Sequence, residues 1–100
     1  SAAVYLGLIL HELTTNAAKY GALSSTVGRL VVNISSSDDM LHLQWFEEGG
    51  APSKEGETRE GFGTTLERAA LQGLDGTLVR EWRGDGLAIS IAIPLEKLAD

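Results

Sequence analysis

The stretch HELTTNAAKYGAL, His11–Leu23, is the part of the chain that decides the fold. Its apolar residues continue a pattern that recurs at steps of three and four positions from about residue 2 to residue 20. That spacing predicts an amphipathic helix over these residues. Gly21 follows directly and predicts the end of the helix.

Four side chains of this helix form a narrow polar stripe: Glu12, Asn16, Lys19 and Tyr20. One interpretation is a solvated surface, which most helices in globular proteins carry. The other is a ligand platform, on which a carboxylate and an amide oxygen hold a hard cation while an ammonium lies beside a phosphate. The helix taken alone leaves both interpretations open.

The rest of the chain predicts two hairpins and a second helix. The segments RLVVNISSS and MLHLQWFE alternate as strands and meet at the turn SDD, and a glycine-rich loop covers residues 48–63. A helical pattern returns at about Thr64–Leu74, and two more strands lie on either side of the turn RGDG. We expect one α+β domain over residues 1–100. It would be a two-layer α/β sandwich whose mixed, largely antiparallel sheet is covered by helices on one face.

Composition excludes several classes of function. The chain has 100 residues, 43% of them hydrophobic, a formal net charge of −6 and no cysteine. The acidic balance argues against a general nucleic-acid surface, although a donor nest and a bound cation can still hold a nucleotide on an acidic protein. Without cysteine there is no disulfide framework and no thiol nucleophile.

The apolar run AAVYLGLIL is too short to span a membrane, and we identify no signal peptide. We therefore expect a cytoplasmic domain that makes no membrane contact. The chain opens inside a predicted helix at Ser1, so we expect it to be a fragment of a longer protein.

Three familiar motifs do not fit. HELTT begins like the zinc-protease helix H-E-x-x-H, but Thr15 stands where the second histidine is required. HELTTN also resembles the phosphoacceptor box of sensor kinases, His-Glu-Leu-Arg-Thr-Pro, but Asn16 replaces the proline. There is no G-x-x-x-x-G-K-[ST] sequence, so any nucleotide site is not a P-loop.

Four boxes in order resemble the gyrase/Hsp90/histidine-kinase/MutL ATPase superfamily. ELTTNAAKY resembles its N-box, and FEEGGAP stands at the position of its adenine box. EGFGTTL resembles its second glycine box, and GLAISIAIP resembles its closing strand. The resemblance covers about residues 4–94 and implies the Bergerat-type ATP-binding fold.

The closest resemblance within the superfamily is to the HWE subfamily of bacterial sensor histidine kinases. It rests on His11 before the N-box and on Trp45-x-Glu47 followed by Gly49-Gly50. It implies a catalytic domain that transfers the γ-phosphoryl group of Mg-ATP to a histidine on a separate dimerisation domain. A response regulator would then receive the phosphoryl group.

The resemblance also implies roles for the helix stripe. Asn16 would be an Mg²⁺ ligand, and Glu12 would be catalytic by orienting a metal-bound water or by helping to deprotonate the acceptor histidine. Lys19 would contact a phosphate. Tyr20 would stack on the purine or pack in the core.

The remaining ATP-binding residues come from the glycine boxes and the loop between them. Glu47 would accept a hydrogen bond from the adenine amine, and Glu48 has no assigned role because it points to the opposite side of the strand. The lid would be Pro52–Glu60. The other predicted nucleotide contacts are Gly49, Gly50, Arg59, Gly61, Phe62, Gly63, Thr64 and Thr65, the two threonines also being candidate N-caps. We expect His11 and Trp45 to be packed residues.

Two other functions remain open at this point. One is a degenerate module that binds a nucleotide or a protein without catalysis. The other is a protein serine kinase of the anti-sigma type. Intact Glu12, Asn16, Glu47 and the glycine loop argue against the degenerate module, and Trp45-x-Glu47 favours the histidine kinase over the serine kinase.

Overall fold

The computed structural model describes residues 2–49, 62–84 and 86–99, with the backbone alone for Tyr20 and residues 62–66. The elements in chain order are α1 (Ala2–Tyr20), the short 3₁₀ helix η1 (Ala22–Ser24), β1 (Arg29–Ser37), β2 (Met40–Glu48), α2 (Phe62–Leu74), β3 (Thr77–Arg83), β4 (Gly86–Pro94) and α3 (Leu95–Leu98).

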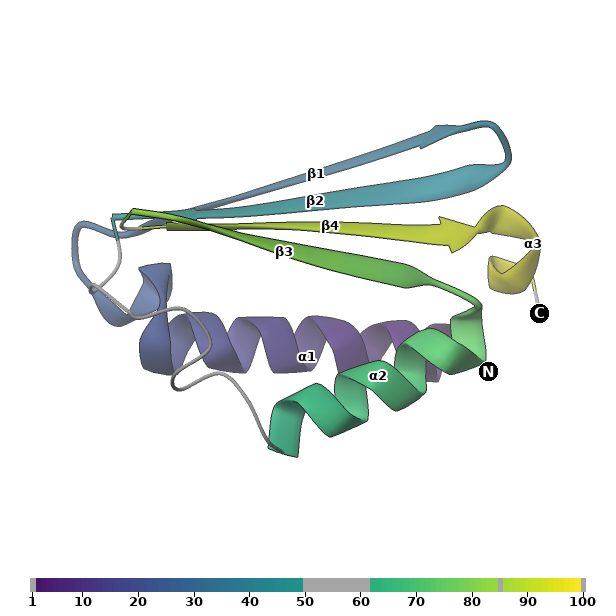
Figure 1. The fold of residues 1–100 in the computed structure, drawn as a ribbon, viewed down its shortest axis with the longest axis horizontal. Coiled ribbons are helices and arrows are strands. Elements are labelled where there is room, and N and C mark those ends of the chain that lie inside the picture. Colours follow the sequence, from purple (N-terminus) through teal and green to yellow (C-terminus); the bar gives the residue numbers. More distant parts are fainter. Residues whose placement is uncertain (1, 50–61, 85, 100) are drawn as a thin grey trace.

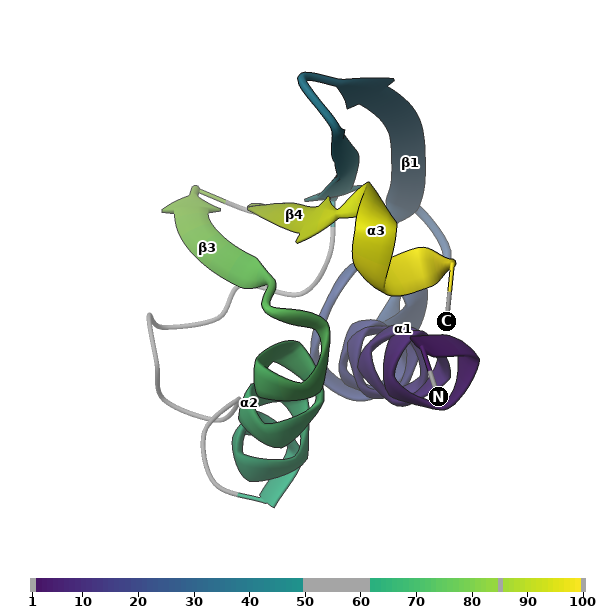
Figure 2. The same ribbon diagram turned by 90° about the vertical axis from the view of Figure 1, so that its right-hand side faces the viewer.

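The four strands form one sheet in the order β1-β2-β4-β3. All three pairings are antiparallel. α1 and α2 lie side by side under one face of this sheet, and α3 lies at the end where β4 stops (Figures 1 and 2). The predicted α+β class, with helices covering one face of a sheet, is confirmed.

The turn between β1 and β2 shows why the first hairpin could be predicted. Asp38 and Asp39 have φ angles of 52° and 63°. Two consecutive left-handed residues match the twist of a two-residue hairpin, and aspartate is one of the few residues other than glycine that adopt this conformation readily.

The core lies between the sheet and the two long helices. Alternate residues of β2 and β4 point toward the helices, because successive side chains of a strand alternate between faces. The buried cluster comprises Ala2, Ile9, Leu13 and Ala17 of α1, Leu43 and Trp45 of β2, Ala70 and Leu74 of α2, and Leu87, Ile89, Ile91 and Ile93 of β4. Full burial of a large aliphatic side chain contributes about 1.5–3 kcal/mol, so this layer is the main source of stability.

Two boundaries differ from the expected ones. α2 begins at Phe62 rather than near Thr64, and α3 was not expected. Both differences have the same cause. The first residues of a helix, or a helix of a single turn, are too few for apolar residues to recur at helical spacing, so the sequence pattern does not reveal them. Within the described residues, no helix is long and apolar enough to cross a membrane.

Candidate nucleotide site

Several predicted site elements meet at one end of the domain. The C-terminal end of α1, helix η1, the end of β2 and the start of β4 all lie at the left of Figure 1. The antiparallel pairing of β2 with β4 places Glu47 opposite Leu87. The second and fourth candidate boxes, FEEGGAP and GLAISIAIP, are thus brought together from distant parts of the sequence.

The helix stripe is not a uniformly solvated face. Glu12 is only 7% exposed, whereas Asn16 is half-buried and Lys19 is exposed. No hydrogen bond or ion pair joins Glu12 to any residue that the structure describes. Because buried polar groups in folded proteins are normally paired, a buried carboxylate in this position calls for a ligand-related explanation.

Glu12 faces the side of α1 on which α2 packs. That side is marked by Tyr5, whose ring lies so close to α2 that a Cβ atom at Gly73 would be 2.6 Å from it. Glu12 follows Tyr5 by two helical turns, so the two side chains share a face. The two helices run in opposite directions, so moving from Tyr5 to Glu12 leads toward the beginning of α2 (Figure 1).

The first turn of α2 contains residues of the second glycine box. Phe62 and Gly63 were expected to precede the helix, but both are inside it. The N-cap roles predicted for Thr64 and Thr65 are therefore wrong, because an N-cap residue has to precede the first helical residue. The backbone N–H groups of this turn have no acceptor within the helix, and such groups commonly bind anions.

Glu47 is the most constrained of the predicted site residues. It is 3% exposed; its Oε1 accepts a hydrogen bond from the Ala22 backbone N–H at 3.1 Å, and its Oε2 accepts one from Trp45 Nε1 at 2.8 Å. Trp45 is buried as expected, at 3% exposure. The contact between its indole and Glu47 was not anticipated, although residues two apart on a strand share a face.

Close backbone approaches explain two glycines at this end of the sheet. Gly49 has a φ of +69°, a conformation that L-residues rarely adopt. A Cβ atom at Gly86 would lie 2.2 Å from the backbone oxygen of Glu47. The positive φ of Gly49 agrees with the prediction that the backbone conformation at this position requires glycine.

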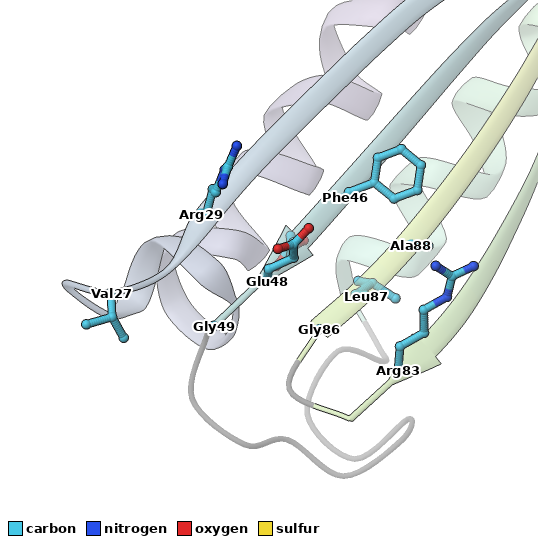
Figure 3. A pocket seen from close by; sticks show the side chains of 10 residues that line it. Val27, Arg29, Phe46, Glu48, Gly49, Arg83, Gly86, Leu87 and Ala88 are labelled. Carbon is cyan, nitrogen blue, oxygen red and sulfur yellow. The ribbon is translucent and has the colours of Figure 1, made fainter.

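A pocket of about 470 Å³ opens at the same end of the sheet. Figure 3 shows that Arg29, Phe46, Glu48 and Arg83 line it from the sheet face opposite the helices. Glu48 thus points away from α1, as predicted. Arg83 Nε donates to Glu81 Oε1 at 2.6 Å, so part of the positive charge at this pocket is already paired.

Some predicted site residues lie outside the described part of the chain. These are Gly50, Arg59, Gly61 and the lid Pro52–Glu60, together with the side chains of Tyr20, Phe62, Thr64 and Thr65. Of the described residues, His11 differs from expectation. Its side chain is exposed rather than packed, because it lies on the opposite side of α1 from the buried Leu13 stripe.

An ion pair beneath the sheet was missed by the sequence analysis. Arg80 Nη2 of β3 lies 2.5 Å from Glu67 Oε1 of α2, with side-chain exposures of 22% and 5%. A signal for it exists in the sequence. Glu67 lies on the same helix face as Ala70 and Leu74. Arg80 lies two positions after the inward Leu78 and therefore on the same face of the strand. Each of these apolar faces thus carries one charge, and the two charges have opposite signs.

Comparison with known proteins gives this arrangement a context. The chain is 39% identical over 94 residues to blue-light-activated histidine kinase 1 of Erythrobacter litoralis, an alignment that covers 92% of the chain. The chain is homologous to histidine kinase catalytic domains. A blue-light-activated histidine kinase of Rhizobium johnstonii is likewise 39% identical over 92 residues, or 89% of this domain. No family model matches.

Solved structures agree. The histidine kinase domain of the Erythrobacter litoralis EL346 blue-light-activated kinase superposes with a TM-score of 0.80 at 26% identity, covering 96% of this chain and 48% of that one. Acinetobacter baumannii histidine kinase AdeS, at 21% identity and a TM-score of 0.72 over 91% of this chain and 46% of that one, shares the fold. The predicted resemblance to histidine kinases is confirmed. The domain spans 26% of the length of each of the two curated relatives named above.

Proposed function

We propose that this domain binds Mg-ATP and transfers its γ-phosphoryl group to a histidine on a separate dimerisation domain. The observation that carries the proposal is the buried Glu12, which has no partner among the described residues and lies one helical turn before the half-buried Asn16. A carboxylate and an amide oxygen on one face are a donor set that suits a hard, oxygen-preferring cation. Similarity to histidine kinases supports the choice of phosphoryl acceptor.

In this proposal Asn16 is the Mg²⁺ ligand and Glu12 is the catalytic carboxylate. The bound Mg²⁺ would neutralise charge on the phosphates during transfer. Glu12 would orient a water at the metal or take part in deprotonating the acceptor histidine. Lys19 is exposed at the end of the same stripe, where its ammonium can reach a phosphate.

The nucleotide would extend from the end of β2 toward the first turn of α2. Glu47 remains our candidate for the acceptor of the adenine amine, since a carboxylate has about four acceptor positions for its hydrogen bonds. The N–H groups of the first turn of α2, from Phe62 to Thr65, would bind phosphate oxygens. Arg59, Gly50, Gly61 and Tyr20 complete the proposed contacts.

The acceptor histidine has to come from outside this domain. His11 is exposed and lies on the same helix as Asn16 but on another face. An imidazole fixed to the helix that binds the metal cannot be placed in line with the γ-phosphate held there. We therefore propose a dimerisation domain of the same kinase as direct partner, a response regulator as the next acceptor, and a cytoplasmic location.

Binding can be tested by thermal unfolding of the 100-residue chain. Mg-ATP should raise its melting temperature, and GTP should do so less, because guanine has a carbonyl oxygen at the position of the adenine amine assigned to Glu47. Asn16→Ala should abolish the Mg²⁺-dependent part of the ATP effect. Asn33→Ala, at an exposed position of β1, is the matched control and should behave like the parent. Equal Mg²⁺ dependence in both variants would remove Asn16 from the metal site.

Transfer can be tested with radiolabelled ATP and a separately expressed dimerisation domain of the parent kinase. Acid-labile label should appear on that domain and not on His11. Acid-stable label on a protein serine would instead favour the anti-sigma type of kinase. Absence of nucleotide binding by the parent chain would favour a degenerate module.

A further inference from the structure

Trp45 and Glu47 connect three segments that are distant in sequence. Glu47 receives one hydrogen bond from the indole on its own strand and another from the backbone of Ala22, on the segment that follows α1. Both contacts are buried, where a hydrogen bond to a charged acceptor is worth more than on the surface. Trp45 and Glu47 are two positions apart on β2, so their side chains lie on the same face of the strand. The indole can therefore donate to one carboxylate oxygen while the Ala22 N–H donates to the other.

Ala22 is restrained from its carbonyl side as well. A Cβ atom at Gly28 would lie 1.6 Å from the Ala22 backbone oxygen, so the chain entering β1 passes directly against it. The N–H of Gly21 meanwhile donates to the Ala17 carbonyl at 3.1 Å, which joins this segment to the last turn of α1. A displacement of Ala22 would therefore be transmitted to the end of α1.

We propose that Trp45 and Glu47 are positioning residues, which set the location of the last turns of α1 relative to the glycine end of β2. This inference rests on the proposed function, since those turns carry Asn16 and Lys19. Trp45 fixes the orientation of the carboxylate, and the carboxylate fixes Ala22. In this arrangement the indole affects nucleotide binding without touching the nucleotide.

Hydrogen exchange at the Ala22 amide tests the connection directly and needs no nucleotide. Trp45→Phe keeps a large ring in the core but removes the indole donor. Glu47→Gln keeps the shape, yet its one amide oxygen cannot replace two separate carboxylate oxygens. Glu47→Gln replaces the charged acceptor of the Ala22 N–H and should speed exchange at that amide by about tenfold or more. Trp45→Phe leaves the acceptor in place but no longer orients it, so it should speed exchange by a smaller factor. Ile91→Val, a core variant without polar change, is the control for general destabilisation.

Nucleotide binding gives the second measurement. Trp45→Phe should weaken both Mg-ATP and Mg-GTP, because it moves the metal-binding helix while the carboxylate assigned to the base contact is still present. Glu47→Gln should in addition reduce the preference for ATP over GTP. Unchanged exchange at Ala22 in both variants, relative to Ile91→Val, would overturn the positioning role. Fast exchange in a chain that binds no nucleotide would support the connection and refute the proposed function instead.

Discussion

Removing Arg80 should destabilise the domain strongly, because it leaves the buried Glu67 without its partner. The Glu67 side chain is 5% exposed, and its Oε1 lies 2.5 Å from Arg80 Nη2. Breaking a buried pair from one side costs about 3–5 kcal/mol. Arg80 is 22% exposed, so we expect the lower end, about 3 kcal/mol, for Arg80→Ala. For a domain of this size that corresponds to a fall in melting temperature of roughly 12–24 °C.

The chain supplies its own control on the same strand. Arg83 and Glu81 have a similar separation of 2.6 Å, but their side chains are 61% and 63% exposed. Arg83→Ala should therefore cost only about 0.2–1 kcal/mol. Replacing both buried partners, in Glu67→Leu with Arg80→Met, should recover most of the stability. Thermal and urea unfolding of the variants measure these differences, and equal losses in Arg80→Ala and Arg83→Ala would refute the reasoning.

Three further predictions concern the site and the core. Glu12→Gln should abolish phosphoryl transfer to the dimerisation domain. It should also raise the free energy of unfolding by about 1 kcal/mol, since it removes a buried charge that has no partner among the described residues; lower stability would show that the carboxylate is paired. Gly86→Ala should lower the free energy of unfolding by about 1–3 kcal/mol, because the new methyl group meets the Glu47 carbonyl; urea unfolding indistinguishable from the parent would contradict that close approach. Leu13→Ala, at 2% exposure, should cost about 2–5 kcal/mol in the same assay, and a loss below 1 kcal/mol would show that the helix layer is not the main core.

Local pattern alone predicted the two long helices, the four strands and the layer arrangement, but not α3 or the first residues of α2. The three- and four-residue spacing defined α1, and alternation defined β2 with the inward Leu43 and Trp45. Such elements can be predicted from sequence because the buried residues of a helix or strand recur at a fixed spacing. The turn at Asp38 and Asp39 was likewise readable, since few residues adopt two consecutive positive φ angles.

Only the tertiary structure decided how the polar side chains are used. From the sequence alone, Glu12 could be a surface charge. It is buried in the structure, on the side of α1 where α2 packs. The sequence predicts Glu47 as a ligand contact. Its hydrogen bond from the Ala22 N–H joins residues 25 positions apart, and it forms only because the segment after α1 folds back against the end of β2. The partner of Glu67 is likewise set by the layering of α2 under β3. Periodicity records which face of an element is buried, whereas the partner of a buried charge is fixed by contacts between elements that no local pattern encodes.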